Sequence, residues 1–171
     1  MADWSAIRKK LEEDYLCPAL RGRVQYFITV YRKSHDHDEG RGAIRVDGVE
    51  LWMGGFHTHE KKVFECLKRI EKEEPEYPRD RLWDRAWIMS AEEGVICEDD
   101  FWWAFSEFDN QSIEKSLCSE HPLVRVFALL DRRVGKRRLL AMRERMQEEQ
   151  EEVRRFYHIR MEAEGLEAPQ A

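Results

Sequence analysis

The chain has 171 residues and a formal net charge of −6, and 42% of its residues are hydrophobic. This length suits one domain or two very small ones, and six tryptophans and eight phenylalanines are enough for a packed core. An acidic chain is not a general nucleic-acid binder, so nucleic acid would need a local basic patch.

The charge is unevenly distributed. Residues 1–73 hold 14 Lys/Arg and 13 Asp/Glu, a balance of +1, and the remaining residues hold 15 and 22, a balance of −7. The four cysteines form no Cys-x-x-Cys pair, which is typical of reduced thiols in the cytoplasm. There is no apolar run of membrane-spanning length and no secretory signal pattern at the start. We therefore expect a soluble cytoplasmic protein with no membrane partner.

A first helix is predicted over about residues 3–15. Asp3 suits the N-cap position. Apolar side chains then recur at the spacing of one helical face: Trp4, Ile7, Leu11 and Tyr15. The helix should stop before Cys17–Pro18, because the residue before a proline avoids helical backbone.

Three antiparallel strands should follow. The stretch "GRVQYFITVYRK" alternates with apolar side chains on both faces, as a strand does. In "GAIRVDGVELWM" two alternating runs flank Asp47–Gly48, and Asp-Gly between such runs is the strongest short signal for a β-hairpin. The sequence therefore predicts a three-stranded meander.

The rest of the chain reads as helical. "HTHEKKVFECLKRIEKEE" has one apolar face, and the proline-containing stretch at 74–80 is the best candidate for a linker. Several helices should follow, and the last is predicted as one long helix from about 136 to 164. The predicted class is α+β: an N-terminal helix, a three-stranded antiparallel meander and a helix in 1–73, then a helical subdomain in 81–171.

Two His-x-His pairs are candidates for a metal site. His35 and His37 follow the first predicted strand in "SHDHDEGRG", and His57 and His59 follow the third. In a meander these two strand ends lie at one edge of the sheet, and imidazoles with nearby acids suit zinc or a related metal. The simpler interpretation is a polar hairpin loop with Gly40 and Gly42 in the turn. We favour the loop, and expect no cofactor.

The densest basic cluster lies at residues 132–138, around a helix break at Gly135. Its members are Arg132, Arg133, Lys136, Arg137 and Arg138. Guanidinium groups at a helix start would suit phosphate groups. Cations at a helix end also complement its dipole and pair with nearby acids, and basic clusters are often only solvated or ion-paired, so ion pairing is the plainer interpretation.

Aromatic side chains are concentrated between residues 83 and 108. At helical spacing such residues usually build a core. Trp102 and Trp103 are adjacent, however, and must point to different sides of their helix, so one of them is expected to be partly exposed. Trp102 and Trp103 are therefore candidates for contact with a partner.

Two long stretches resemble a family of small bacterial proteins of unknown function. They are "CPALRGRVQYFITVYRKSHDHDEGRGAIRVDG" and "SIEKSLCSEHPLVRVFALLDRRVGKRRL". The resemblance implies a bacterial cytoplasmic origin and carries no activity. The order helix, three strands, helix is also similar to that of double-stranded-RNA-binding domains and of the arm-site domain of tyrosine recombinases, and residues 112–135 resemble one HEAT-type helical repeat.

The favoured function is a non-catalytic interaction with another macromolecule. No nucleophile motif or phosphate-binding loop is present, although scattered residues can still assemble an active site, so catalysis is left open. The acidic charge suits a protein partner of basic character, such as a toxin or nuclease that this chain would neutralise. The alternatives are a nucleic-acid binder using residues 132–138 and a metal-dependent enzyme using the His-x-His pairs. Whether the chain forms a homo-oligomer is left open.

Overall fold

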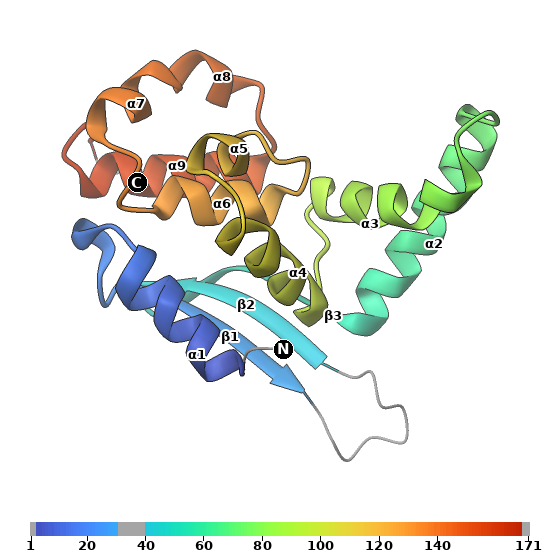
Figure 1. Cartoon of the computed structure of the whole chain (residues 1–171), viewed down its shortest axis with the longest axis horizontal. Coiled ribbons are helices and arrows are strands. Elements are labelled where there is room, and N and C mark those ends of the chain that lie inside the picture. Colours follow the sequence, from blue (N-terminus) through green and yellow to red (C-terminus); the bar gives the residue numbers. More distant parts are fainter. Residues whose placement is uncertain (1–2, 31–39, 169–171) are drawn as a thin grey trace.

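The α+β class is confirmed by a computed structural model, which describes residues 3–30 and 40–168. A three-stranded sheet lies beside the N-terminal helix, and the helices that follow the sheet run to the C-terminal helix (Figure 1). The predicted bounds of most elements hold, and the last predicted helix is the main exception.

The N-terminal segment begins as predicted and has an unexpected backbone. Helix α1 covers Trp4–Lys9 and continues directly into a π-helical segment, η1, at Lys10–Tyr15. The helical run ends before Leu16, and a short 3-10 turn, η2, follows at Pro18–Leu20. The stop before the proline agrees with the steric restriction on the residue that precedes it.

The sheet is the predicted antiparallel meander of β1 (Val24–Val30), β2 (Gly40–Val46) and β3 (Val49–Gly55), in the order β1-β2-β3. Asp47 and Gly48 both have positive φ angles, 50° and 83°, as a type I′ hairpin turn requires. A register shift follows Ile44 in the pairing of β2 with β3. The local turn chemistry of Asp-Gly thus decides how these two strands pair.

Two helices extend from the sheet to one side of the molecule, at the right of Figure 1. Helix α2 covers Phe56–Glu73, and α3 covers Leu82–Glu92 after the 3-10 turn η3 at Arg79–Arg81. They pack on each other around a small cluster of buried side chains: Val63, Cys66, Ile70 and Ala86. The stretch 74–80 lies between these two helices.

Helix α4 (Glu98–Asp109) packs directly against the sheet. Two glycines on the strands permit this approach: a Cβ on Gly54 would overlap the main-chain carbonyl of Ile96, and one on Gly42 would overlap the ring of Phe101. The absence of these two side chains therefore brings the start of α4 against the end of β3 and the first turn of α2.

The main hydrophobic core joins the two halves of the chain. Its buried side chains come from the N-terminal helix and the sheet, such as Leu11 and Tyr26, and from the helical half, such as Phe101 and Phe127. Helices α5 (Ile113–Leu117) and α6 (Pro122–Leu130) complete its centre. The division into subdomains at 74–80 remains a prediction, with one core extending across it.

The prediction of one long helix over 136–164 is wrong. The structure has three helices there, α7 (Lys136–Ala141), α8 (Arg143–Gln147) and α9 (Glu151–Ala163). The chain turns at Glu149 and Gln150: Arg125 donates to the Glu149 carboxylate at 2.9 Å, the Gln150 N–H donates to the same oxygen, and Gln150 is extended. A tertiary ion pair therefore fixes a break that helical periodicity does not reveal.

The break lets α9 fold back into the molecule. Its apolar face packs on α6 and buries Val153, Phe156, Tyr157 and Met161. On the sheet side of α9, Arg155 donates to the carbonyl of Leu51 on β3. In the parts of the chain that the structure describes, no helix is both long enough and apolar enough to cross a bilayer.

Candidate functional site

Two grooves beside helix α4 share one tryptophan. The first, here called the Trp83 groove, has a volume of about 460 Å³ and lies between α3 and α4. It is lined by Trp83, Asp84, Trp87, Ile88, Trp103 and Glu107. Its volume is in the range of natural ligand-binding clefts.

The second, here called the Asp109 groove, has a volume of about 580 Å³ and lies where α1 meets α4. Its main lining residues are Ile7, Asp99, Trp102, Trp103, Phe105 and Asp109. Since Trp103 lines both grooves, its indole stands between them. The two grooves and Trp103 form what we call the Trp103 surface.

The two neighbouring tryptophans of α4 have different environments, as the sequence predicts. Trp103 is 69% exposed, whereas Trp102 is half-buried and packs edge-to-face on Trp4 with ring centroids 5.6 Å apart. Trp83 is also 53% exposed and packs on the exposed ring of Phe64 at 5.5 Å. The exposed aromatic area therefore continues from Trp103 to α2.

The Trp103 surface carries acidic groups. Each groove has two carboxylates, Asp84 and Glu107 in one and Asp99 and Asp109 in the other, and the lining residues that the structure describes include no Lys or Arg. Burial opposes ionisation of Asp109, but hydrogen bonds from Tyr15 at 2.5 Å and Lys10 at 3.1 Å hold the pKa of Asp109 below its ordinary value. Asp109 is therefore ionised at neutral pH, with Lys10 as its cationic partner at the edge of the groove.

The predicted basic cluster is largely engaged within the molecule. Arg133 donates to both carboxylate oxygens of Asp131, at 3.0 and 2.9 Å, and its guanidinium lies over the Tyr15 ring at 5.2 Å. Lys136 donates to the carbonyl of Glu164, and Arg138 pairs with Glu114 at 3.0 Å.

Arg132 and Arg137, the other two members of that cluster, are exposed. The cluster therefore sits at the start of α7 with three of its five charges already neutralised or hydrogen-bonded. This is the ion-paired arrangement that the sequence left open as the alternative to phosphate binding.

The histidine pairs are only partly described. His35 and His37 lie outside the described residues. His57 and His59 both lie in the first turn of α2, but they point apart, since His57 is exposed and His59 is fully buried. The His-x-His pair thus contributes one side chain to the interior and one to the surface.

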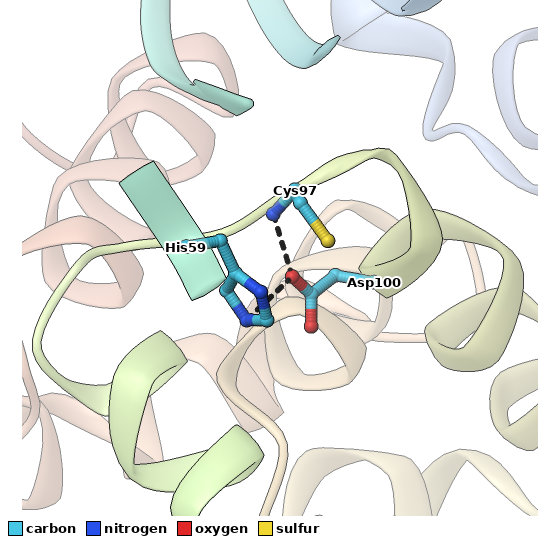
Figure 2. A group of neighbouring side chains, drawn as sticks. All are labelled: His59, Cys97 and Asp100. Carbon is cyan, nitrogen blue, oxygen red and sulfur yellow. Dashed lines mark hydrogen bonds and ion pairs between the residues drawn. The ribbon is translucent and has the colours of Figure 1, made fainter. Parts of the chain in front are cut away.

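Buried His59 lies beside two residues of α4 that the sequence did not single out for chemistry (Figure 2). They are Cys97 and Asp100, both fully buried. Cys97 is the N-cap of α4 and Asp100 is its third residue, so that the side chain of each bonds the backbone of the other in a capping box. The acid-rich stretch "CEDD" signals that helix start, but nothing local in the sequence relates it to His59.

The sequence model of the SF0329 protein family matches residues 3–161. This match confirms that a single family covers nearly the whole chain, while the bacterial origin expected from the sequence remains a prediction. No curated protein and no solved structure matches the chain.

Proposed function

Because the chain belongs to the SF0329 protein family, whose description states no activity, we propose a function from its surface: it is a non-catalytic module that binds a basic segment of a partner protein on the Trp103 surface. The observation that carries the proposal is the indole of Trp103, which is 69% exposed and stands between two acidic grooves.

Large exposed aromatic groups favour an interaction surface. Tryptophan is enriched among the residues that dominate binding energy, because it supplies a large contact area and loses little conformational entropy. Trp103, Trp83 and Phe64 are among the most exposed large apolar side chains of the described residues. Their position along and beside the grooves makes them anchors for an inserted side chain.

The acidic lining favours a cationic segment. The alkyl stems of lysine and arginine can lie along an indole, and their charged heads interact with the face of the ring. Asp84 and Glu107 lie in the same groove as Trp103 and can pair with those heads. Residues 74–171 also carry a balance of −7, which speeds encounter with a basic partner.

The competing nucleic-acid hypothesis has weaker support. Binding to phosphates needs cations that are free to displace counterions. The ion pairs of Arg133 and Arg138 already place carboxylates against the cluster at 132–138. Phosphate would have to compete with Asp131 and Glu114 for those guanidinium groups.

A peptide titration followed by NMR tests the proposal. The probe is a synthetic peptide of alternating lysine, arginine and leucine, added to the full chain labelled with ¹⁵N, and the matched control peptide has glutamate in place of each cation. We expect the basic peptide to shift the indole N–H signals of Trp103 and Trp83. Trp103→Ala should weaken binding about 10-fold or more, as expected for loss of an interface anchor.

Leu140→Ala is the control variant, because Leu140 is 44% exposed on α7 and lies outside both grooves. It should bind the basic peptide as the parent protein does. Equal binding of the acidic peptide, or shifts confined to residues 132–138, would contradict the proposal. Binding of a short DNA or RNA duplex that Trp103→Ala leaves unchanged would favour the basic cluster instead.

A further inference from the structure

The carboxylate of Asp100 is held in place by three donors. Its Oδ1 accepts from the indole N–H of Trp87 at 2.7 Å and from Nε2 of His121 at 2.9 Å, and its Oδ2 accepts from the backbone N–H of Cys97 at 2.7 Å. Nδ1 of His121 accepts from the N–H of Leu123, so the proton of that imidazole is on Nε2. These bonds fix the carboxylate with Oδ2 toward His59 (Figure 2).

His59 is the exception in this polar cluster. It is fully buried, yet neither Nδ1 nor Nε2 has a hydrogen-bond partner. Its Nε2 lies 3.7 Å from Asp100 Oδ2, which is too far for a hydrogen bond. A buried polar group without a partner is costly, about 1–3 kcal/mol, and a bound ion that takes up the free lone pair would remove that cost.

We propose that His59, Cys97 and Asp100 form a binding site for a zinc ion or a cation of similar softness. The ligand atoms of the three residues lie within 4.8 Å of one another, and all three residues are buried. They come from α2 and from the start of α4, so that the ion would join the two elements.

The donor set and spacing select the metal. A nitrogen, a thiolate sulfur and a carboxylate oxygen are the ligands that zinc prefers, whereas magnesium and calcium take oxygen. At zinc–ligand bonds of about 2.0–2.3 Å, two ligand atoms of a tetrahedral site are roughly 3.4–3.6 Å apart. The 3.7 Å between His59 Nε2 and Asp100 Oδ2 is close to that value, and the sulfur of Cys97 lies within 4.8 Å of both ligand atoms.

The surroundings suit a bound ion as well. Trp87 and His121 hold the ligating carboxylate from behind, as partners outside the ligand set do in zinc sites. Neither ring nitrogen of His59 is engaged in a hydrogen bond, so the imidazole has a lone pair to offer an ion. Uptake of Zn²⁺ forms the Zn–S bond to Cys97 and releases the thiol proton to solvent.

A metal titration of the full chain, without a histidine tag, tests the site. The protein is treated with a chelator, dialysed, and titrated with ZnCl₂ by calorimetry and with CoCl₂ by absorbance. We expect one ion per chain, thiolate charge-transfer and tetrahedral d–d bands with cobalt, and no response to MgCl₂. At a free zinc concentration 100 times the Kd, the ratio of folded to unfolded protein should rise about 100-fold.

His59→Leu separates a metal ligand from a packing residue. The histidine makes no hydrogen bond, so the variant should be at least as stable as the parent protein without metal. It should lose the zinc-dependent gain in stability, with affinity at least about 10-fold weaker. Cys97→Ser should keep the fold and lose the cobalt–thiolate band.

His57→Gln and Cys118→Ser are the matched controls, since one is an exposed histidine of the same helical turn and the other an exposed thiol. Both should bind one zinc ion as the parent does. The proposal is overturned if the parent protein shows no zinc uptake, if either control abolishes it, or if His59→Leu binds zinc with unchanged affinity.

Discussion

The indole N–H of Trp87 donates to Oδ1 of Asp100 at 2.7 Å, while the same side chain lines the Trp83 groove. Trp87 also lies against the imidazole of His59, with ring centroids 4.3 Å apart. One half-buried side chain therefore separates the surface groove from the buried His59–Cys97–Asp100 cluster. A substitution of Trp87 should therefore affect both the groove and the buried cluster. Loss of the ring would alter the groove, and loss of the N–H would alter the cluster.

Trp87→Phe removes the N–H donor and keeps an aromatic ring in the groove. Asp100 then loses one of its three donors, so the free energy of unfolding should fall by about 1–3 kcal/mol, because Oδ1 of this buried carboxylate keeps only His121 of its two donors. Chemical denaturation followed by circular dichroism measures this change. Ile88→Val, which trims the same groove without touching Asp100, is the control; an equal loss in both variants would show that groove packing causes the effect.

Gly54→Ala should be strongly destabilising. The added Cβ would overlap the backbone carbonyl of Ile96, which cannot move without shifting the start of α4. We expect a loss of about 1–3 kcal/mol in the free energy of unfolding, as for other overpacked interiors. Gly135→Ala is the matched control, because nothing lies within 4 Å of its added Cβ, and a similar loss there would refute this account.

Asp109→Asn should lower stability in a pH-dependent manner. The pKa of Asp109 is lower in the folded chain than its ordinary value of 3.8, so the charge stabilises the fold above that pH and ceases to do so as the pH falls through the folded-state pKa. At pH 7 the free energy of unfolding of the variant should be about 1 kcal/mol lower, chiefly because the ion pair with Lys10 is lost. Burial, together with Asp109, raises the pKa of Tyr15 to about 12, so the phenol stays a donor throughout.

Urea denaturation of the parent and variant proteins at pH 7 and at several values below 3.8 measures this dependence. The difference between them should shrink steadily over the acid range. Asp84→Asn, an exposed acid of the other groove, should show a smaller difference at every pH. A difference for Asp109→Asn that grows on acidification would have the wrong sign and would exclude this explanation.

Arg160→Met should be among the most damaging single changes. Arg160 is 2% exposed, and its guanidinium donates to the carbonyls of Leu129, Asp131 and Val134 at 2.7–3.0 Å. Removing it leaves these acceptors without their donor and leaves Glu164 without its 2.9 Å partner. We expect the free energy of unfolding to fall by about 3–5 kcal/mol, which a lower midpoint of urea denaturation would measure.

Arg155→Met is the control for that measurement, since Arg155 lies on the same helix but its side chain is 42% exposed. Its bonds to Glu151 and to the Leu51 carbonyl are at the surface, where one such pair contributes about 1 kcal/mol or less. Equal losses in the two variants would mean that helix α9 depends on charge in general and not on the buried guanidinium.

The sheet could be predicted because its signals are local. Alternation in β1 and the Asp47–Gly48 turn lie within a few residues, and both φ values are those that the dipeptide favours. The break between α8 and α9 could not be predicted in this way, because it depends on Arg125, which is far from Glu149 in the sequence. The apolar spacing is interrupted at Glu149 but resumes in the same frame at Val153, so a sequence pattern alone joins the helices.

The Trp103 surface and the His59–Cys97–Asp100 cluster also differ in how far the sequence predicts them. Adjacent tryptophans on one helix must diverge, so the exposure of one of Trp102 and Trp103 could be predicted from spacing, while the structure identifies it as Trp103. The partners of His59 could not be predicted, because Cys97 and Asp100 come close to His59 only when α4 packs on the sheet at Gly54 and Gly42. A glycine in a strand gives no sign of which helix will approach it.

The bonds of Arg160 also have a consequence for biosynthesis. The carbonyls that it satisfies lie 26 to 31 positions earlier in the chain, at the end of α6 and in the turn beyond it. While the ribosome is adding those intervening residues, the end of α6 has neither this donor nor the apolar face of α9 over it. The nascent chain can form the sheet and its hairpin early, but it can close its interior only after Arg160 has left the exit tunnel, so completion of the fold is a late step in synthesis.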